Sequence, residues 1–280
     1  MISLLRLVKV HPLFWLVLGT GIVTGYFKEV AMLFSIVFIH EMGHAVMARK
    51  FGWRLTKVEL LPFGGVAETE EYGNRPVKEE LLVVLAGPIQ HLWLMGLSFF
   101  LLPMSWWSAA DHQVFLFHNL TILLFNLLPV KPLDGGKLVF VLQSALMPYR
   151  QAMTVSFYFS LAVLAALSVT ALALLPFHLN LIVVLAFLAI HHYLEWRQRH
   201  FIFMRFLIER RDKKTGVPEK LRPVFVSGNE QVADVIRQFR RDCRHVIIKK
   251  DSGDAAEEQT VVDAFFHKDK RMCPVGSLFL

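Results

Sequence analysis

The sequence predicts a mainly α-helical polytopic membrane protein, with six transmembrane helices followed by a small α/β domain. Hydrophobic residues make up 55% of the 280-residue chain and the mean hydropathy is +0.47, which is more apolar than an ordinary soluble domain. Several apolar runs also reach the roughly 20 residues that a helix needs to cross the hydrocarbon core. The expected spans are residues 11–27, 30–48, 80–102, 113–130, 153–175 and 178–196.

Basic residues alternate between the connections of these spans. They gather before the first span, between the second and third, between the fourth and fifth, and after the sixth. The opposite connections carry a single basic residue, Lys28. By the positive-inside rule this pattern places both termini in the cytoplasm. The first span is too long, and too weakly followed by small residues, for a cleaved signal peptide, so we expect it to stay as an anchor.

The composition becomes polar after the sixth span. Strand-like segments at 222–226 and 245–249 flank residues 232–239, whose apolar positions have helical spacing. We therefore expect a membrane domain over 1–196, a basic linker over 197–216 and a small cytoplasmic α/β domain over 217–280. The net charge of +7 favours attraction to anionic lipid over a nucleic-acid partner. Cys243 and Cys273 alone imply no disulfide framework.

The second span contains the sequence His40-Glu41-Met42-Gly43-His44. On a helix the two histidines lie one turn apart on the same face, which suits two imidazole ligands of one Zn²⁺. Glu41 is placed to accept a proton from a metal-bound water. Ionisable residues at this depth are costly and usually functional. The alternative interpretation is a structural histidine pair buried against neighbouring helices.

A third zinc ligand is expected from the segment Phe125–Gly136, which leaves the fourth span on the same side as His40. Pro129 and Pro132 should break the helix there, and a glycine pair should let the backbone turn where a β-carbon would clash. Asp134 in this break is the candidate ligand, since catalytic zinc usually takes three protein ligands. The alternative is a cytoplasmic turn with a solvated aspartate.

With both motifs present, the chain resembles the site-2 protease family of intramembrane zinc metalloproteases. His40-Glu41-Met42-Gly43-His44 matches the first motif of the family, and Asn126-x-x-Pro129 followed by Leu133-Asp134-Gly135 matches the second. The resemblance implies Zn²⁺ on His40, His44 and Asp134, with Glu41 as general base. It also implies that Asn126 contacts the substrate near the metal.

Two further segments fit the family. Leu61–Val66 resembles its re-entrant loop or β-hairpin, which can pair with an extended substrate, so Phe63, Gly64 and Gly65 join Asn126 and Pro129 as substrate-binding candidates. Ala86-Gly87-Pro88 matches the small-residue motif of the third family span, but the Asn often found shortly afterwards is absent. His91 lies nearby and is interpreted as a core histidine with one hydrogen bond, the alternative being that it lines the cleft.

Residues 224–266 resemble a single cystathionine-β-synthase (CBS) domain. Thr260 and Asp263 stand where such domains often hold the ribose of an adenine nucleotide, which makes ATP a possible cofactor, although the Gly usually ahead of them is missing. Lone CBS modules generally pair, so a homo-oligomer is expected. Six spans with one CBS domain resemble the sporulation branch of the family. That branch implies the membrane-associated proform of sigma-K as substrate, inhibitory membrane proteins as partners and the mother-cell membrane around the forespore as location.

Two alternatives of other classes compete with the protease. A six-span metal or proton transporter would share the intramembrane His and Asp, but it would not need Glu41 beside His40, and the sequence shows no internal repeat of the kind common in transporters. A scaffold that has lost activity is disfavoured because every catalytic position is filled.

Overall fold

The computed structural model describes residues 8–10, 12–61, 64–69, 73–174, 179–211, 220–267 and 269–279. The chain divides into two compact units, each made of segments that are separate in sequence. Unit 1 contains Met1–Glu71, Leu81–Leu138 and His178–Val184, and unit 2 contains Tyr72–Glu80, Val139–Phe177 and Leu185–Leu280.

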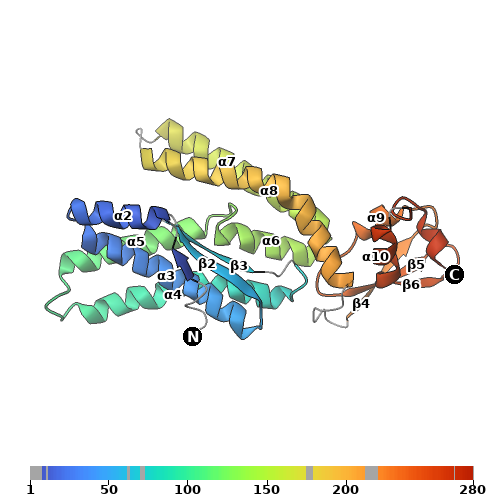
Figure 1. The fold of residues 1–280 in the computed structure, drawn as a ribbon, viewed down its shortest axis with the longest axis horizontal. Helices are drawn as coiled ribbons and strands as arrows, with labels where there is room; N and C mark the ends of the chain where they lie inside the picture. Colours follow the sequence, from blue (N-terminus) through green and yellow to red (C-terminus); the bar gives the residue numbers. More distant parts are fainter. Residues whose placement is uncertain are drawn as a thin grey trace. The chain divides into compact units, whose positions relative to one another are not determined.

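Unit 1 is built around the helix that carries the histidine motif, α3 (Phe27–Lys50). Helix α5 (Ala109–Asn126) lies beside α3 (Figure 1). The other helical parts of this unit belong to α2 (Pro12–Val23), α4 (Val77–Leu101), α6 (Asp134–Leu146) and the start of α8 (Leu179–Arg211).

A three-stranded sheet completes unit 1, in the order β1-β2-β3. Strands β2 (Leu55–Leu61) and β3 (Gly64–Thr69) form an antiparallel hairpin, and β1 (Val8–Val10) runs parallel to β2. The hairpin expected from the sequence is therefore present, whereas the parallel strand β1 was not expected. Phe63, one of the substrate-binding candidates, lies outside the described residues.

Four helices of the described residues are long and apolar enough to cross a membrane: α3, α4, α7 (Tyr149–Leu174) and α8 (Leu179–Arg211). The first predicted span corresponds to α2, which has 12 residues and so rises only about 18 Å against a hydrocarbon core of about 30 Å. The fourth corresponds to α5, with 18 residues and a more polar first half. Four candidate spans thus stand in place of the six expected.

The predicted break between the fourth span and Asp134 is present. Helix α5 ends at Asn126 and α6 begins at Asp134, with Pro129 and Pro132 between them. A β-carbon on Gly135 would lie 2.2 Å from the Leu127 carbonyl oxygen, and one on Gly136 would lie 2.5 Å from the backbone nitrogen of Lys131. No side chain larger than hydrogen fits at either glycine, because the backbone of the break packs directly against the start of α6. Asp134 is the first residue of that helix.

Unit 2 joins α7 and α8 to the C-terminal domain. Its sheet has the order β4-β5-β6, with β4 parallel to β5 and β6 antiparallel to β5. The predicted strands and helix of this region are confirmed, although the helix ends three residues earlier than expected. The elements are β4 (Leu221–Val226), α9 (Val232–Ile236), β5 (Arg244–Lys249), β6 (Ala255–Glu257), α10 (Glu258–Phe266) and the 3-10 helix η1 (Val275–Leu278).

The end of α8 takes part in the core of the C-terminal domain. Phe206 and Leu207 are fully buried and cluster with sheet and helix residues such as Val226, Ile236 and Ile247. Residues 197–211, expected as the start of a basic linker, are thus the last turns of α8. The linker was predicted from the basic residues of this stretch. Apolar residues of the stretch such as Phe206 are instead buried in the core of the C-terminal domain.

Candidate metal centre

Three potential metal ligands converge inside unit 1. Helix α3 places His40 and His44 one turn apart, with their Nε2 atoms separated by 3.2 Å. Asp134, from the first turn of α6, brings its Oδ2 to 3.1 Å from each of these nitrogens. All three side chains are buried. Among the described residues this is the one group of three or more His, Cys, Asp or Glu side chains spaced to hold a metal ion.

The donor set fits Zn²⁺. Zinc binds histidine nitrogen and carboxylate oxygen at about 2.0–2.2 Å in a tetrahedral arrangement, which sets neighbouring ligand atoms about 3.4 Å apart. The observed separations of 3.1–3.2 Å are close to that value. Two imidazoles and one carboxylate also leave a fourth position for water or substrate, as in catalytic zinc sites.

The second oxygen of Asp134 has its own partner. Lys137, one turn further along α6, donates to Asp134 Oδ1 at 3.0 Å. The carboxylate therefore turns Oδ2 towards the histidines and Oδ1 towards the ammonium group. This arrangement suits a ligand that offers one oxygen to the metal.

Helix α4 orients the imidazole of His44. His44 Nδ1 lies 2.8 Å from the Val83 carbonyl oxygen, to which it must donate, so Nε2 keeps its lone pair for the metal. A β-carbon on Gly87 would lie 2.2 Å from His44 Nε2, and one on Gly43 would lie 2.5 Å from the Ala86 carbonyl oxygen. These two glycines allow α3 and α4 to approach closely enough to form the site.

His91 lies behind His40. It is fully buried, as expected of a core histidine, but it makes two hydrogen bonds rather than the one expected. His91 Nε2 is 3.1 Å from His40 Nδ1, and His91 Nδ1 is 3.1 Å from the side-chain oxygen of Asn119 in α5.

The remaining candidates occupy different positions in unit 1. Glu41 is buried in α3, next to His40. Asn126 is the last residue of α5 and Pro129 follows it in the break, both partly buried. Gly64 and Gly65 begin β3, where they pair with Leu61 and Leu60 of β2.

Sequence reasoning missed Lys137, Asn119 and Val83. Lys137 could have been found from its helical spacing to Asp134, three residues away. The other two could not, because neither stands in a recognisable motif and both act through contacts between helices.

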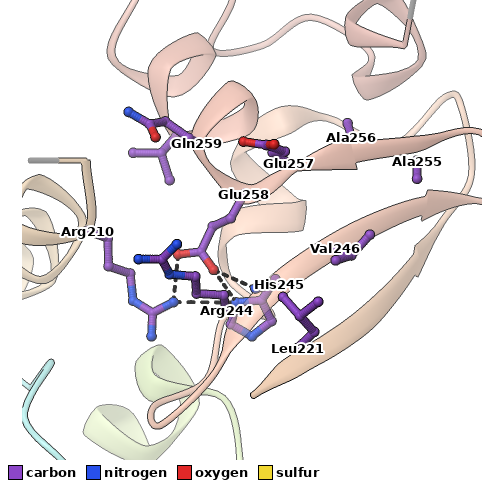
Figure 2. Close-up of a pocket in the computed structure, with 11 residues that line it drawn as sticks. Arg210, Leu221, Arg244, His245, Val246, Ala255, Ala256, Glu257, Glu258 and Gln259 are labelled. Atoms are coloured by element: carbon purple, nitrogen blue, oxygen red, sulfur yellow. Dashed lines mark hydrogen bonds and ion pairs between the residues drawn. The ribbon is translucent and has the colours of Figure 1, made fainter. Parts of the chain in front are cut away.

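The C-terminal domain contains a cavity of about 330 Å³. Figure 2 shows Arg210 of α8, strand β5 and the start of α10 around it. Thr260 and Asp263, the nucleotide-binding candidates, are not among its lining residues. Asp263 instead forms an ion pair with Arg211 at 2.8 Å.

A buried ionic cluster forms one wall of the cavity. Glu258 accepts from Arg210 at 2.7 Å and from His245 Nδ1 at 2.8 Å (Figure 2). Burial alone would raise the pKa of Glu258, but the His245 hydrogen bond and the Arg210 charge lower it to about 2. Burial lowers the pKa of His245 and outweighs its bond to Glu258. His245 Nε2 accepts from the backbone N–H of Arg240 at 3.0 Å, which also favours the neutral ring.

Comparison with known proteins matches residues 28–113 and 104–169 to the model of peptidase family M50. The chain is 42% identical to stage IV sporulation protein FB of Bacillus subtilis over 273 residues, covering 96% of this chain and 94% of that protein. It is 32% identical to zinc metalloprotease MJ0392 of Methanocaldococcus jannaschii, over 39% of this chain and 32% of the relative. The solved site-2 protease from the same archaeon matches with a TM-score of 0.52 and 25% identity, covering 67% of this chain and 89% of that one.

The chain belongs to peptidase family M50. It is a multi-pass membrane protein and an intramembrane zinc metalloprotease, as the sequence motifs predicted. The transporter alternative finds no support in these similarities.

Proposed function

We propose that His40, His44 and Asp134 hold the catalytic Zn²⁺ and that Glu41 is the general base of peptide hydrolysis. The observation that carries this proposal is the convergence of two Nε2 atoms and one carboxylate oxygen at 3.1–3.2 Å from one another. A zinc ion bound there would act as a Lewis acid, acidifying water and polarising the scissile carbonyl.

The protein side chains then have separate tasks. Glu41 accepts the proton of the attacking water and passes it to the leaving amine. His44 keeps its Nδ1 proton on the Val83 carbonyl, so its ring stays fixed. Lys137 holds Asp134 Oδ1, which leaves Oδ2 directed to the metal.

The substrate must be extended at the site, because a helix engages its own carbonyl groups in hydrogen bonds. Strand β3 pairs with β2 on one side, and we propose that its other edge receives the substrate by strand addition. Phe63, Gly64 and Gly65 would line this pairing, while Asn126 and Pro129 would contact the substrate near the metal. Glycines at the start of β3 let another backbone approach closely.

Two substitutions test the active centre. Glu41→Gln should keep zinc stoichiometric and abolish cleavage of a co-expressed substrate, because only the proton acceptor is removed. Asp134→Ala should lose both zinc and cleavage, because two ligands bind the metal weakly. Glu29→Gln, an exposed acid on the same helix, is the control and should retain both. Full zinc and activity in Asp134→Ala would refute the ligand assignment.

We further propose that the substrate is a membrane-associated pro-protein of the pro-sigma-K kind, cleaved during sporulation and restrained by inhibitory membrane proteins. This assignment is supported by the similarity to stage IV sporulation protein FB, which extends over 96% of this chain and 94% of that protein. Co-expression with a sigma-K proform should give a shortened product that is absent with Glu41→Gln. A failure of cleavage with this substrate, but not with other membrane-tethered proteins, would redirect the substrate assignment.

The full topology remains a proposal: six spans over 1–196, with N- and C-termini cytoplasmic. The alternation of basic residues between connections supports it. Reporter fusions after Arg54, Arg150 and Arg205 should read cytoplasmic, and a fusion within Ser105–Asp111 should read external. A cytoplasmic signal from the last fusion would refute the model.

For the C-terminal region we propose a CBS-like domain over 217–280 that binds an adenine nucleotide such as ATP and pairs in a homo-oligomer. The parallel β4–β5 pair joined through α9 and the adjoining cavity support this. Calorimetry on the full chain in detergent should detect ATP binding that Arg244→Ala, at the cavity, weakens. If Asp263→Ala weakens binding and Arg244→Ala does not, the nucleotide lies at Thr260 and Asp263 and not in the cavity. No binding by the parent protein would end the nucleotide proposal.

A further inference from the structure

We infer that His91 is a positioning residue for the metal centre: together with Asn119 it fixes the tautomer and the ring orientation of His40. The inference rests on the proposed zinc ligands and adds to them a hydrogen-bonded chain that runs from α5 through α4 to α3. Its members are Asn119, His91 and His40, and each is buried.

The direction of every hydrogen bond in this chain follows from its far end. The side-chain nitrogen of Asn119 donates to the Phe115 carbonyl oxygen of its own helix at 3.0 Å. The Asn119 side-chain oxygen therefore faces His91, and as a carbonyl oxygen it can only accept. His91 Nδ1, at 3.1 Å, must then carry the proton.

The proton on His91 Nδ1 also determines the direction of the hydrogen bond to His40. A neutral imidazole protonated on Nδ1 has its lone pair on Nε2, so His91 Nε2 accepts from His40 Nδ1 at 3.1 Å. With its proton on Nδ1, His40 presents the lone pair of Nε2 towards His44 and Asp134. This is the tautomer that a metal ligand requires, and an outer hydrogen bond of this kind orients the ring.

The two ligand histidines are thus fixed by different means. His44 uses a main-chain carbonyl, which no substitution can remove, whereas His40 depends on the side chain of His91. The hydrogen bonds of His91 run to His40 and Asn119, so its effect on the site is exerted through His40. Loss of the His91 side chain should therefore be detected most directly as a lower affinity for zinc.

The experiment measures Zn²⁺ affinity of the full-length protein in detergent by competition with a chelator. His91→Phe should weaken zinc binding by roughly 10–100-fold, the usual range for loss of an outer partner. His91→Gln offers both an acceptor for His40 and a donor for Asn119, and its zinc affinity should stay within about three-fold of the parent, a smaller loss than that range. His192→Phe is the matched control. His192 is a buried histidine in α8 that bonds Ser160 and the Leu188 carbonyl, and its loss should leave zinc affinity unchanged.

A double-mutant cycle tests whether Asn119 acts through His91. Asn119→Leu alone should weaken zinc binding, while adding it to His91→Phe should cost nothing further, because the chain is already broken. The visible absorption bands of the Co²⁺-substituted protein should change in His91→Phe and return towards the parent spectrum in His91→Gln. This readout reports the coordination geometry and not the stability of the fold.

Parent-like zinc affinity and Co²⁺ spectrum in His91→Phe would overturn the inference, as would fully additive losses in the cycle. If His91→Phe does not fold, Asn119→Leu carries the test: weaker zinc binding with a changed Co²⁺ spectrum supports the inference, and parent-like values of both overturn it. Failure of the underlying ligand assignment is separate, since it would show as retained zinc in Asp134→Ala.

Discussion

The candidate metal centre of unit 1 and the Arg210 cluster of unit 2 both bury ionisable side chains, but the hydrogen bonds of these side chains are arranged differently. Around the metal centre, imidazoles and an amide pass single hydrogen bonds to one another, and the atoms that face the proposed ion keep their lone pairs. In unit 2, Arg210 donates to Asn74, to the Cys243 and Arg240 carbonyls and to Glu258.

The first arrangement suits the binding of an ion, whereas the second suits stabilisation of the fold. The metal centre leaves three ligand atoms without a proton between them and relies on glycines for close helix approach. In the Arg210 cluster, one guanidinium donates to four acceptors. Substitutions in the candidate metal centre should therefore lower zinc affinity and proteolytic activity. Substitutions in the Arg210 cluster should lower the free energy of unfolding.

Arg210→Met should produce the largest loss of stability. It leaves the carboxylate of Glu258 buried without its cation, and breaking a buried pair in this way costs about 3–5 kcal/mol. The measurement is the urea dependence of thiol labelling at Cys243, which is buried, in a Cys273→Ser background.

The neighbouring arginine supplies the control. Arg211 pairs with Asp263 at the surface, with both side chains more than two-fifths exposed, so Arg211→Met should cost about 0–1 kcal/mol. Equal effects of the two substitutions would show that the Arg210 cluster does not stabilise the domain more than a surface ion pair does.

Gly87→Ala should produce the largest loss at the metal centre. Its β-carbon would occupy space 2.2 Å from His44 Nε2, so the imidazole must leave its position. We expect zinc affinity to fall by about 100-fold, at the upper end of the range for a disturbed outer partner, and cleavage to stop. Zinc titration and substrate cleavage measure the two effects.

Gly96→Ala, in the same helix, is the matched control. A β-carbon there meets nothing within 4 Å, so zinc affinity and cleavage should not change. Loss of zinc in both variants would indicate disruption of α4 as a whole and not a local clash with His44.

Acidification should weaken the C-terminal domain in two steps. Because burial lowers the pKa of His245, the folded domain binds fewer protons than the unfolded chain and loses stability as pH falls below about 6.5. The contribution of Glu258, whose pKa is lowered to about 2, is complete above about pH 4.5 and is lost as pH falls from there towards 2. Urea midpoints from the methyl NMR signals of Ile236 and Ile247 in detergent should follow this course.

Glu258→Gln should remove the second step, because no carboxylate remains to be protonated. A urea midpoint that rises on acidification from pH 7 to pH 5 would contradict the assignment of a neutral, buried His245.

Lys137→Met should produce the smallest change. The lysine side chain is half exposed, so it orients Asp134 less firmly than a buried partner would, and zinc affinity should fall by about 10-fold or less. Lys28→Met, which removes an exposed ion pair with Asp111, is the control and should leave zinc binding unchanged. A loss as large as that of Gly87→Ala would mean that Lys137 holds more than the Asp134 carboxylate.

The parts of the molecule that could be predicted from sequence are those coded by short patterns. The one-turn spacing of His40 and His44, the prolines before Asp134 and the two strands of the C-terminal domain each carry their signal locally. The parts that could not be predicted depend on contacts distant in sequence. Strand β1 has three residues and is defined by pairing with β2, and His91 gains its role from α3 and α5 together.

The continuity of α8 into the C-terminal core has a practical consequence for dissecting the protein. A truncation at the compositional boundary, near residue 217, would strip the covering from Phe206 and Leu207, which are fully buried in the intact chain. The shortened protein would expose a new hydrophobic patch. Aggregation or poor expression caused by this patch would then be mistaken for a loss of regulation. Domain boundaries for such work should therefore follow the buried side chains of α8, and point substitutions at the cavity are safer probes of the C-terminal domain than its removal.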